Sequence, residues 1–150
     1  MHTFHNLAEL QAAEGTTLGT SSWLRIDQAR INDFAEATGD FQWIHVDTER
    51  ARAGQFGTTI AHGYLTLSLV PLLGSETYAF DGWPTVVNYG LDRVRFLNPV
   101  RCDSHIRATV DLVTVTPVDA GVQAKLRYTV EIQGETRPAC VAETIVLLAS

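Results

Sequence analysis

The order of elements along the chain predicts an α+β fold, with helices in the first half and antiparallel strands in the second. Residues 60–73 form an apolar run without Asp, Glu, Lys or Arg, which is typical of a buried helix. After Pro84, β-branched and aromatic residues alternate with polar ones over several runs, which is typical of strands with one buried face. Helices packed on one face of an antiparallel sheet satisfy both patterns.

The first half carries clear helix start and stop signals. Asp27 is a good N-cap and Gly39 a good C-terminal stop for the second helix, whose apolar residues recur at helical spacing. The expected elements are, in order, a helix at 6–13, a strand at 16–26, a helix at 28–38, a loop at 40–59 with one turn around 48–53, and the buried helix at 60–73.

The second half reads as four strands, at residues 85–96, 106–116, 122–133 and 137–148. The third alternates apolar and polar residues without a break, so it has one wet and one buried face. Residues 119–121 form a good hairpin turn before it. The last strand is apolar on both faces, which favours an interior place in the sheet. One apolar helix facing several one-sided strands indicates a sheet wrapped around that helix, the arrangement called a hotdog.

Composition bounds the class of protein. A chain of 150 residues with 45% hydrophobic content is long enough for one domain, residues 1–150, with its own core. The net charge of −6 and only 11 scattered Lys and Arg argue against nucleic-acid binding. The two cysteines, Cys102 and Cys140, are too few for a disulfide framework and give no zinc spacing. They fit a reducing cytoplasm, and a single disulfide between them is the alternative.

Targeting and membrane segments are not expected. The start, MHTFHNLAEL, lacks the basic stretch and apolar core of a secretory signal. Residues 56–75 look membrane-like at first, but they contain several polar residues and Pro71, and their apolar part is shorter than a bilayer span. A helix buried inside the protein is the better interpretation.

Two short segments combine ionisable and glycine residues: GDFQWIHVD at 39–47 and FGTTIAHGYLTLSL at 56–69. Together they resemble the MaoC-like dehydratases, and within them the single-domain (R)-specific enoyl-CoA hydratases, whose pattern is a GD-x-x-x-x-H-x-D loop followed by an I-A-H-G helix start. The nodulation-protein-N-like subgroup is similar in QWIHVD, FGTTIAHG and a later NYGL-x-x-VRF.

This resemblance implies that Asp40 and His45 form a catalytic dyad that holds one water. The dyad adds this water to the double bond of a trans-2-enoyl thioester and gives a (3R)-hydroxyacyl product, with no metal or redox cofactor. The backbone N–H of Gly63 belongs to the oxyanion hole in this scheme. One departure is Gln42, because many relatives carry Asn there, whose amide positions the water.

The chemistry of hydration supports these assignments independently. Negative charge builds on the thioester oxygen as hydroxide adds, so a donor aimed at that oxygen lowers the barrier. Gly63 at a helix start offers a free amide and close backbone approach. His45 titrates near neutral pH, whereas Asp40 needs desolvation to act as more than a fixed charge, which we expect from Phe41 and Trp43. Which of the two takes the first proton is left open.

Plainer interpretations exist for each residue. Asp40 alone is also typical of a turn, and His45 alone of a buried structural histidine. Their occurrence together with AHG favours catalysis. His62 either makes a structural hydrogen bond at the helix start or contacts the thioester, and Asp47 is expected to cap the next turn. A metal site built from these four residues is conceivable, but no HxxxH or HExxH spacing supports it.

Substrate contacts are less well defined by the sequence. Arg95, with Arg93 and Arg101, suits the phosphates of coenzyme A, or these are ordinary strand charges. Candidates to line an acyl pocket, each of which also suits the core, are Tyr64, Leu65, Ser68, Trp83 and Tyr89.

The predicted function is therefore an (R)-specific enoyl-CoA hydratase of acyl-CoA metabolism. Two rivals remain: a hotdog acyl-CoA thioesterase, and a non-catalytic acyl-thioester-binding module. The helix at 60–75 has no carboxylate, which counts against a thioesterase. A lone unit of this kind exposes a sheet edge, so we expect a homodimer.

Overall fold

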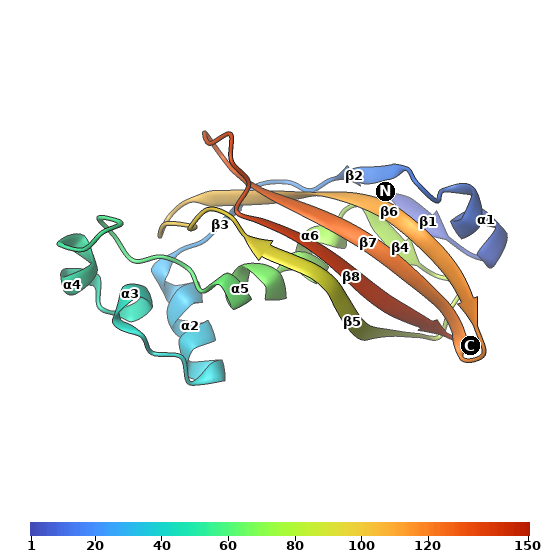
Figure 1. Ribbon diagram of the computed structural model, residues 1–150, viewed down its shortest axis with the longest axis horizontal. Helices are drawn as coiled ribbons and strands as arrows, with labels where there is room; N and C mark the ends of the chain where they lie inside the picture. Colours follow the sequence, from blue (N-terminus) through green and yellow to red (C-terminus); the bar gives the residue numbers. More distant parts are fainter.

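The computed structural model describes residues 1–150 and is built on one antiparallel sheet (Figure 1). The strand order is β2-β6-β7-β8-β5, and β3 also pairs with β6. The strands are β2 (Thr17–Thr20), β3 (Leu24–Arg25), β5 (Thr85–Phe96), β6 (His105–Val118), β7 (Gly121–Ile132) and β8 (Cys140–Ala149). The predicted α+β class is confirmed, and β8 has the interior place that its two apolar faces indicated.

The alternation of apolar and polar residues along the strands determines which face of the sheet is buried. Every second residue of β7 is buried, and from Ala124 to Ile132 these residues pair across to buried residues of β6, as in Leu112 opposite Leu126. A shift of one residue would turn this whole apolar set to solvent, so the register is strongly specified. The turn into β7 requires Gly121, whose φ is +144° and where a Cβ would lie 2.0 Å from the Leu148 carbonyl oxygen.

Helix α2 of the first half begins and ends at its predicted caps. The first four helices are α1 (Leu7–Ala12), α2 (Gln28–Thr38), α3 (Trp43–Val46) and α4 (Thr48–Arg52). The Asp27 carboxylate accepts from the N–H of Arg30, and Gly39, with φ of +82°, ends α2 by donating to the Ala35 carbonyl. The expected loop at 40–59 is more ordered than predicted, because it contains α3 as well as the predicted turn, which is α4.

The single buried helix expected at residues 60–73 is wrong in two respects. Residue 60 is extended, and the helix begins at Gly63 and divides into α5 (Gly63–Ser68) and α6 (Val70–Gly74). Pro71 explains the break, because it has no N–H to donate back to residue 67. The pair is also buried on one side only, since Tyr64 is 68% exposed and Leu72 49%.

The other differences are short elements. The strand expected at 16–26 is divided into β2 and β3, because between them the Ser21 hydroxyl accepts the Ala108 N–H in place of a backbone carbonyl. A small parallel sheet of β1 (His2–Phe4) and β4 (Tyr78–Phe80) was not predicted. No helix of the protein combines the length and the apolar character that crossing a bilayer takes.

The core lies between the helices α5 and α6 and the inner face of β6, β7 and β8. Leu65, Leu69 and Leu73 supply the helical side of it. The N-terminus of α5 therefore projects from the packed layers toward α2 and α3, at the end of the molecule where the predicted site residues are found (Figure 1).

Candidate active site

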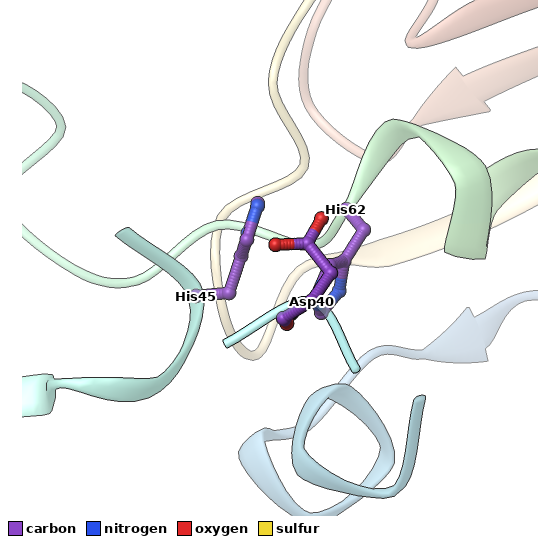
Figure 2. A group of neighbouring side chains, drawn as sticks. All are labelled: Asp40, His45 and His62. Carbon is purple, nitrogen blue, oxygen red and sulfur yellow. The ribbon is translucent and has the colours of Figure 1, made fainter. Parts of the chain in front are cut away.

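Three of the predicted site residues meet in space. Asp40 comes from the loop after α2, His45 from α3, and His62 from the position just before α5. One potential ligand atom of each lies within 4.8 Å of the others. Figure 2 shows the Asp40 carboxylate beside the His45 ring, with His62 completing the group. Two groups that share one water through ordinary hydrogen bonds lie about 4.5 Å apart, so this spacing suits a dyad that holds a water.

The protonated nitrogen of neutral His45 follows from its anchor. Its Nδ1 lies 2.7 Å from the Ile60 carbonyl oxygen, which can only accept, so Nδ1 carries the hydrogen. Nε2 is then the unprotonated nitrogen and has no protein hydrogen-bond partner. The Gln28 amide donates to the His45 carbonyl at 2.8 Å and fixes α3 from the other side. A neutral imidazole held in one tautomer, with its lone pair free, is the form that a general base requires.

Burial lowers the pKa of His45 below its ordinary value of 6.5, and the neighbouring His62 lowers it further, while the Ile60 carbonyl and Asp40 act in the opposite direction. The side chain is 6% exposed, in keeping with desolvation as the main cause. His45 is therefore neutral at pH 7.

This pKa predicts the acid limb of the activity profile. With His45 as the base expected from the sequence, the logarithm of kcat/KM for the expected hydration should stay level as pH falls through 7 and decline only below the ordinary histidine value of about 6.5, because protonation of His45 removes that base. Initial rates in buffers of constant ionic strength measure this directly. A decline centred above that value would contradict the assignment of His45 as the base.

His62 connects the parts of the site. It is 2% exposed, and its Nε2 donates to the Asp40 main-chain carbonyl at 3.0 Å. Its ring stacks on His45 with 3.8 Å between centroids, and it lies 4.9 Å from the ring of Phe34. Its own carbonyl accepts the first helical N–H groups of α5. His62 is thus placed to hold the Asp40 loop against His45, while its buried Nδ1 has no partner.

Asp40 differs from expectation in its environment. It is exposed, and its carboxylate accepts only the N–H of Gln42, at 3.3 Å. The prediction that Phe41 and Trp43 desolvate it is wrong. Phe41 is 56% exposed, and the ring of Trp43 packs instead under the guanidinium of Arg50, 4.1 Å away. In the single chain the carboxylate of the dyad faces solvent.

Gly63 has the free amide that the chemistry needs. It is the first residue of α5, and its N–H donates to no protein acceptor. A Cβ at this position would lie 3.1 Å from the ring of Phe96, so glycine also keeps room between the helix start and β5.

The side chains of the remaining predicted residues make few contacts within the protein. Gln42 is exposed, and its side chain has no protein hydrogen bond, although its carbonyl accepts the N–H of His45. Tyr64 is exposed and meets the edge of Phe96, 6.0 Å between centroids. Arg95 is exposed and donates to the Val94 carbonyl, whereas Arg101 donates to that of Phe56.

Of the four residues considered as a metal site, Asp40, His45 and His62 lie together and Asp47 does not join them. Asp47 accepts from the N–H of Arg50 and caps α4, as predicted. The rings of His45 and His62 are stacked, with 22° between their planes. Nitrogen lone pairs lie in the ring planes, so those of stacked rings run side by side and do not converge on one ion. The donor set therefore fits acid–base chemistry better than metal ligation.

Several residues that build the site carried no sequence signal of their own. Gln28 and Phe34 lie on α2, Ile60 contributes only its carbonyl, and Phe96 comes from the end of β5. Phe34 lies on the apolar face of α2, and its contact with His62 depends on the tertiary arrangement.

A groove lies along α5 and α6, beyond the residues of the site. A cavity of about 440 Å³ lies between α5, α6 and the strands β5 and β8, and Leu67 and Ser68 form its end nearest Gly63. Ser68 and Tyr89, both proposed as acyl-pocket residues, line it, whereas Leu65 is buried in the core.

Comparison with known proteins agrees with this arrangement. The model of the MaoC-like domain matches residues 9–133. The 3-hydroxyacyl-thioester dehydratase Z of Mycobacterium tuberculosis is 53% identical over 147 residues, 97% of each chain. Nodulation protein N of Rhizobium meliloti is 41% identical over 150 residues, 95% of this chain and 90% of the other. The chain belongs to the MaoC-like family, as its paired motifs indicated.

Solved structures confirm the hotdog fold. The (R)-hydratase of A. caviae involved in PHA biosynthesis superposes with a TM-score of 0.73 and 26% identity, covering 90% of this chain and 96% of the other. The wrapped-sheet arrangement expected from the one-sided strands is therefore the correct one.

Proposed function

We propose that this protein catalyses the reversible hydration of trans-2-enoyl-CoA to (3R)-3-hydroxyacyl-CoA. It is a hydro-lyase, as its relatives named as a dehydratase and a hydratase are. The observation that carries the proposal is the cluster of the Asp40 carboxylate with the His45 and His62 side chains, next in the chain to Gly63, whose N–H has no protein acceptor.

In the proposed mechanism one water lies between Asp40 and His45. His45 Nε2 takes a proton as the water oxygen bonds to C3 of the enoyl thioester, and Asp40 orients the water and stabilises the imidazolium that forms. The electron pair of the double bond moves toward the thioester oxygen, giving an enolate. The dyad then returns the proton to C2. Because one water supplies both the hydroxyl at C3 and the proton at C2 from the same side of the double bond, the addition is syn.

In this mechanism the N–H of Gly63 stabilises the negative charge that develops on the thioester oxygen. Its N–H has no protein acceptor, so it is free to donate to the thioester oxygen. A donor fixed in advance stabilises the enolate oxygen without reorganisation, and loss of one such donor typically costs roughly 3–4 kcal/mol of barrier.

The remaining predicted residues have supporting roles in this proposal. His62 holds the main chain of Asp40 and keeps the dyad together. Gln42 and Tyr64 line the solvent side of the site, and Arg95 on β5 meets phosphate groups of coenzyme A. A cytoplasmic location is part of the proposal, and the two free cysteines fit it.

The direct experiment is to mix purified protein with crotonyl-CoA and follow the absorbance of the conjugated thioester. We expect it to fall to an equilibrium value without release of free thiol. A thiol reagent in a parallel reaction tests the thioesterase alternative, because a thioesterase releases coenzyme A. Binding of crotonyl-CoA with neither change would indicate a non-catalytic acyl-binding module.

We also propose that two copies of the chain pair through β5. This strand is hydrogen-bonded on one side only, to β8, and exposes a row of large apolar side chains. They include Val86, Val87, Tyr89, Leu91 and Phe96, between 45% and 61% exposed. A two-fold axis beside β5 would satisfy the free edge of both copies, and it would also cover Phe96 next to Gly63.

The dimer predicts a mass of twice 16.5 kDa by light scattering at micromolar concentration. Val87→Glu should raise the dissociation constant of the dimer tenfold or more, because it buries an unpaired charge in the interface. Gln123→Glu, on the outer face of β7, is the matched control and should leave the mass unchanged. A monomeric wild type would contradict the pairing.

A further inference from the structure

One side chain of α2 connects the two segments that hold His45. Gln28 lies between α3, which carries His45, and residues 59–60, which carry the carbonyl that anchors the imidazole. Its Nε2 donates to the His45 carbonyl at 2.8 Å, and its Oε1 accepts the hydroxyl of Thr59. The orientation of the amide follows from chemistry, because a main-chain carbonyl can only accept and therefore faces the hydrogens on Nε2.

These hydrogen bonds close a ring around the base. From the imidazole, His45 Nδ1 donates to the carbonyl of Ile60, which follows Thr59 in the chain. From Thr59, the hydroxyl donates to Gln28, and Gln28 donates back to the His45 carbonyl. The Ile60 N–H also donates to the Ile44 carbonyl at 3.0 Å. The main chain and the ring of His45 are therefore both held by groups that Gln28 connects.

The surroundings leave the bridge little freedom to rearrange. Thr59 is 1% exposed, and its carbonyl accepts the N–H of Cys102 at 2.9 Å, which fixes residues 59–60 from the other side. No main-chain N–H donates to the His45 carbonyl, so Gln28 is its partner in the protein. The second hydrogen of the amide goes to Asn32 at 2.9 Å. Since a buried polar group that loses its partner is costly, the amide holds the two segments in one relative position.

We infer that Gln28 and Thr59 form a positioning pair that fixes the orientation of the His45 imidazole for catalysis. The inference rests on the proposed hydratase function and adds to it two residues that no motif marks. Both act through His45, because the hydrogen bonds place Gln28 at its main chain and Thr59 beside its anchor, Ile60. His45 Nε2 has to point at the water it shares with Asp40, and misalignment of a base lowers the rate of the chemical step more than it weakens binding.

The experiment compares Thr59→Val, which keeps the shape of the side chain but has no hydroxyl, with Thr59→Ser, which keeps the hydroxyl. Thr59→Val should lower kcat for crotonyl-CoA about 10-fold and Thr59→Ser by less than about twofold, with KM near that of the wild type in both. Gln28→Met removes both bonds at similar length and should lower kcat about 10- to 100-fold. Asn32→Ala is the matched control, because it removes the third partner of the same amide, and should leave kcat unchanged.

A second measurement reports on the imidazole without the need for activity. Nitrogen NMR of protein with ¹⁵N-labelled histidine rings shows which nitrogen carries the hydrogen, and the spectrum of His45→Gln identifies the signals of His45. In the wild type above pH 7 the hydrogen should be on Nδ1, where the Ile60 carbonyl accepts it. In Thr59→Val and Gln28→Met the signals should move toward a mixture of tautomers. A loss of stability alone would lower Tm without this change.

The outcomes separate this inference from the function on which it rests. Turnover by the wild type with unchanged kcat in folded Thr59→Val and Gln28→Met overturns the positioning pair and leaves the hydratase intact. A loss in Thr59→Ser as large as in Thr59→Val, or a lower kcat with the His45 signals of the wild type, also overturns it. If Gln28→Met does not fold, the two Thr59 variants decide. Absence of turnover in the wild type overturns the proposed function, and the inference about catalysis with it.

Discussion

Replacement of Gly63 by proline is expected to lower kcat about 10²- to 10³-fold, the usual cost of one oxyanion donor, whereas alanine should retain most of the activity. Proline removes the N–H that we assign to the thioester oxygen. Alanine keeps it. The two variants therefore differ at the main-chain nitrogen that the mechanism uses, which carries a hydrogen in alanine and a ring carbon in proline.

The local structure makes this pair a well-matched comparison. Gly63 is the first residue of α5, a position at which proline is well tolerated. His62 before it has φ of −59° and ψ of 139°, the extended conformation that a residue preceding proline prefers. Both variants place a Cβ near the ring of Phe96, at 3.1 Å, so both bear this contact.

The measurement is kcat and KM with crotonyl-CoA, with circular dichroism to compare the folds. The assignment requires the difference between the two variants to lie mainly in kcat, because the bond strengthens as charge develops. Equal activity of the proline and alanine variants would show that the Gly63 N–H is not a catalytic donor.

Asp40→Asn and His45→Gln are each expected to reduce kcat about 10²- to 10⁴-fold, because the dyad supplies the acid and base of the reaction. Asp40→Asn removes the charge but leaves the main-chain carbonyl that His62 holds, so the loop should keep its place. The double variant should be little worse than either single one, since the two residues act on the same water.

Asp47→Asn is the matched control for the dyad. Asp47 lies two residues beyond His45, but its carboxylate caps α4, so the substitution should leave the rate close to that of the wild type. Full activity in Asp40→Asn, or a loss in Asp47→Asn as large as in Asp40→Asn, would contradict the assignment.

Local signals in the sequence were sufficient for much of the fold. Asp27 and Gly39 bound α2 because their side-chain and backbone chemistry acts within one turn. The alternation of apolar and polar residues in β7 predicted its buried face for the same reason, because this pattern is local and does not depend on distant residues. The pairing of the two motifs likewise brought Asp40, His45 and Gly63 into one hypothesis.

Features that depend on distant contacts could not be predicted. The isolated WIHV sequence is a weak helix former, and α3 is held by the amide of Gln28 and by the bonds between residues 44–45 and Ile60. Desolvation of Asp40 was assigned to its sequence neighbours, but Trp43 packs on Arg50 instead. The break at Leu69 had a signal in Pro71, which the apolar run obscured.

The central claim is that one water, held by Asp40 and His45 on a single face of the substrate, supplies both the hydroxyl and the new proton. Hydration of crotonyl-CoA in deuterium oxide, with the product analysed by proton NMR, tests it most directly. We expect one C2-deuterated diastereomer, that of syn addition, with R configuration at C3. A mixture of C2 diastereomers formed in the initial phase, or anti addition, would contradict it.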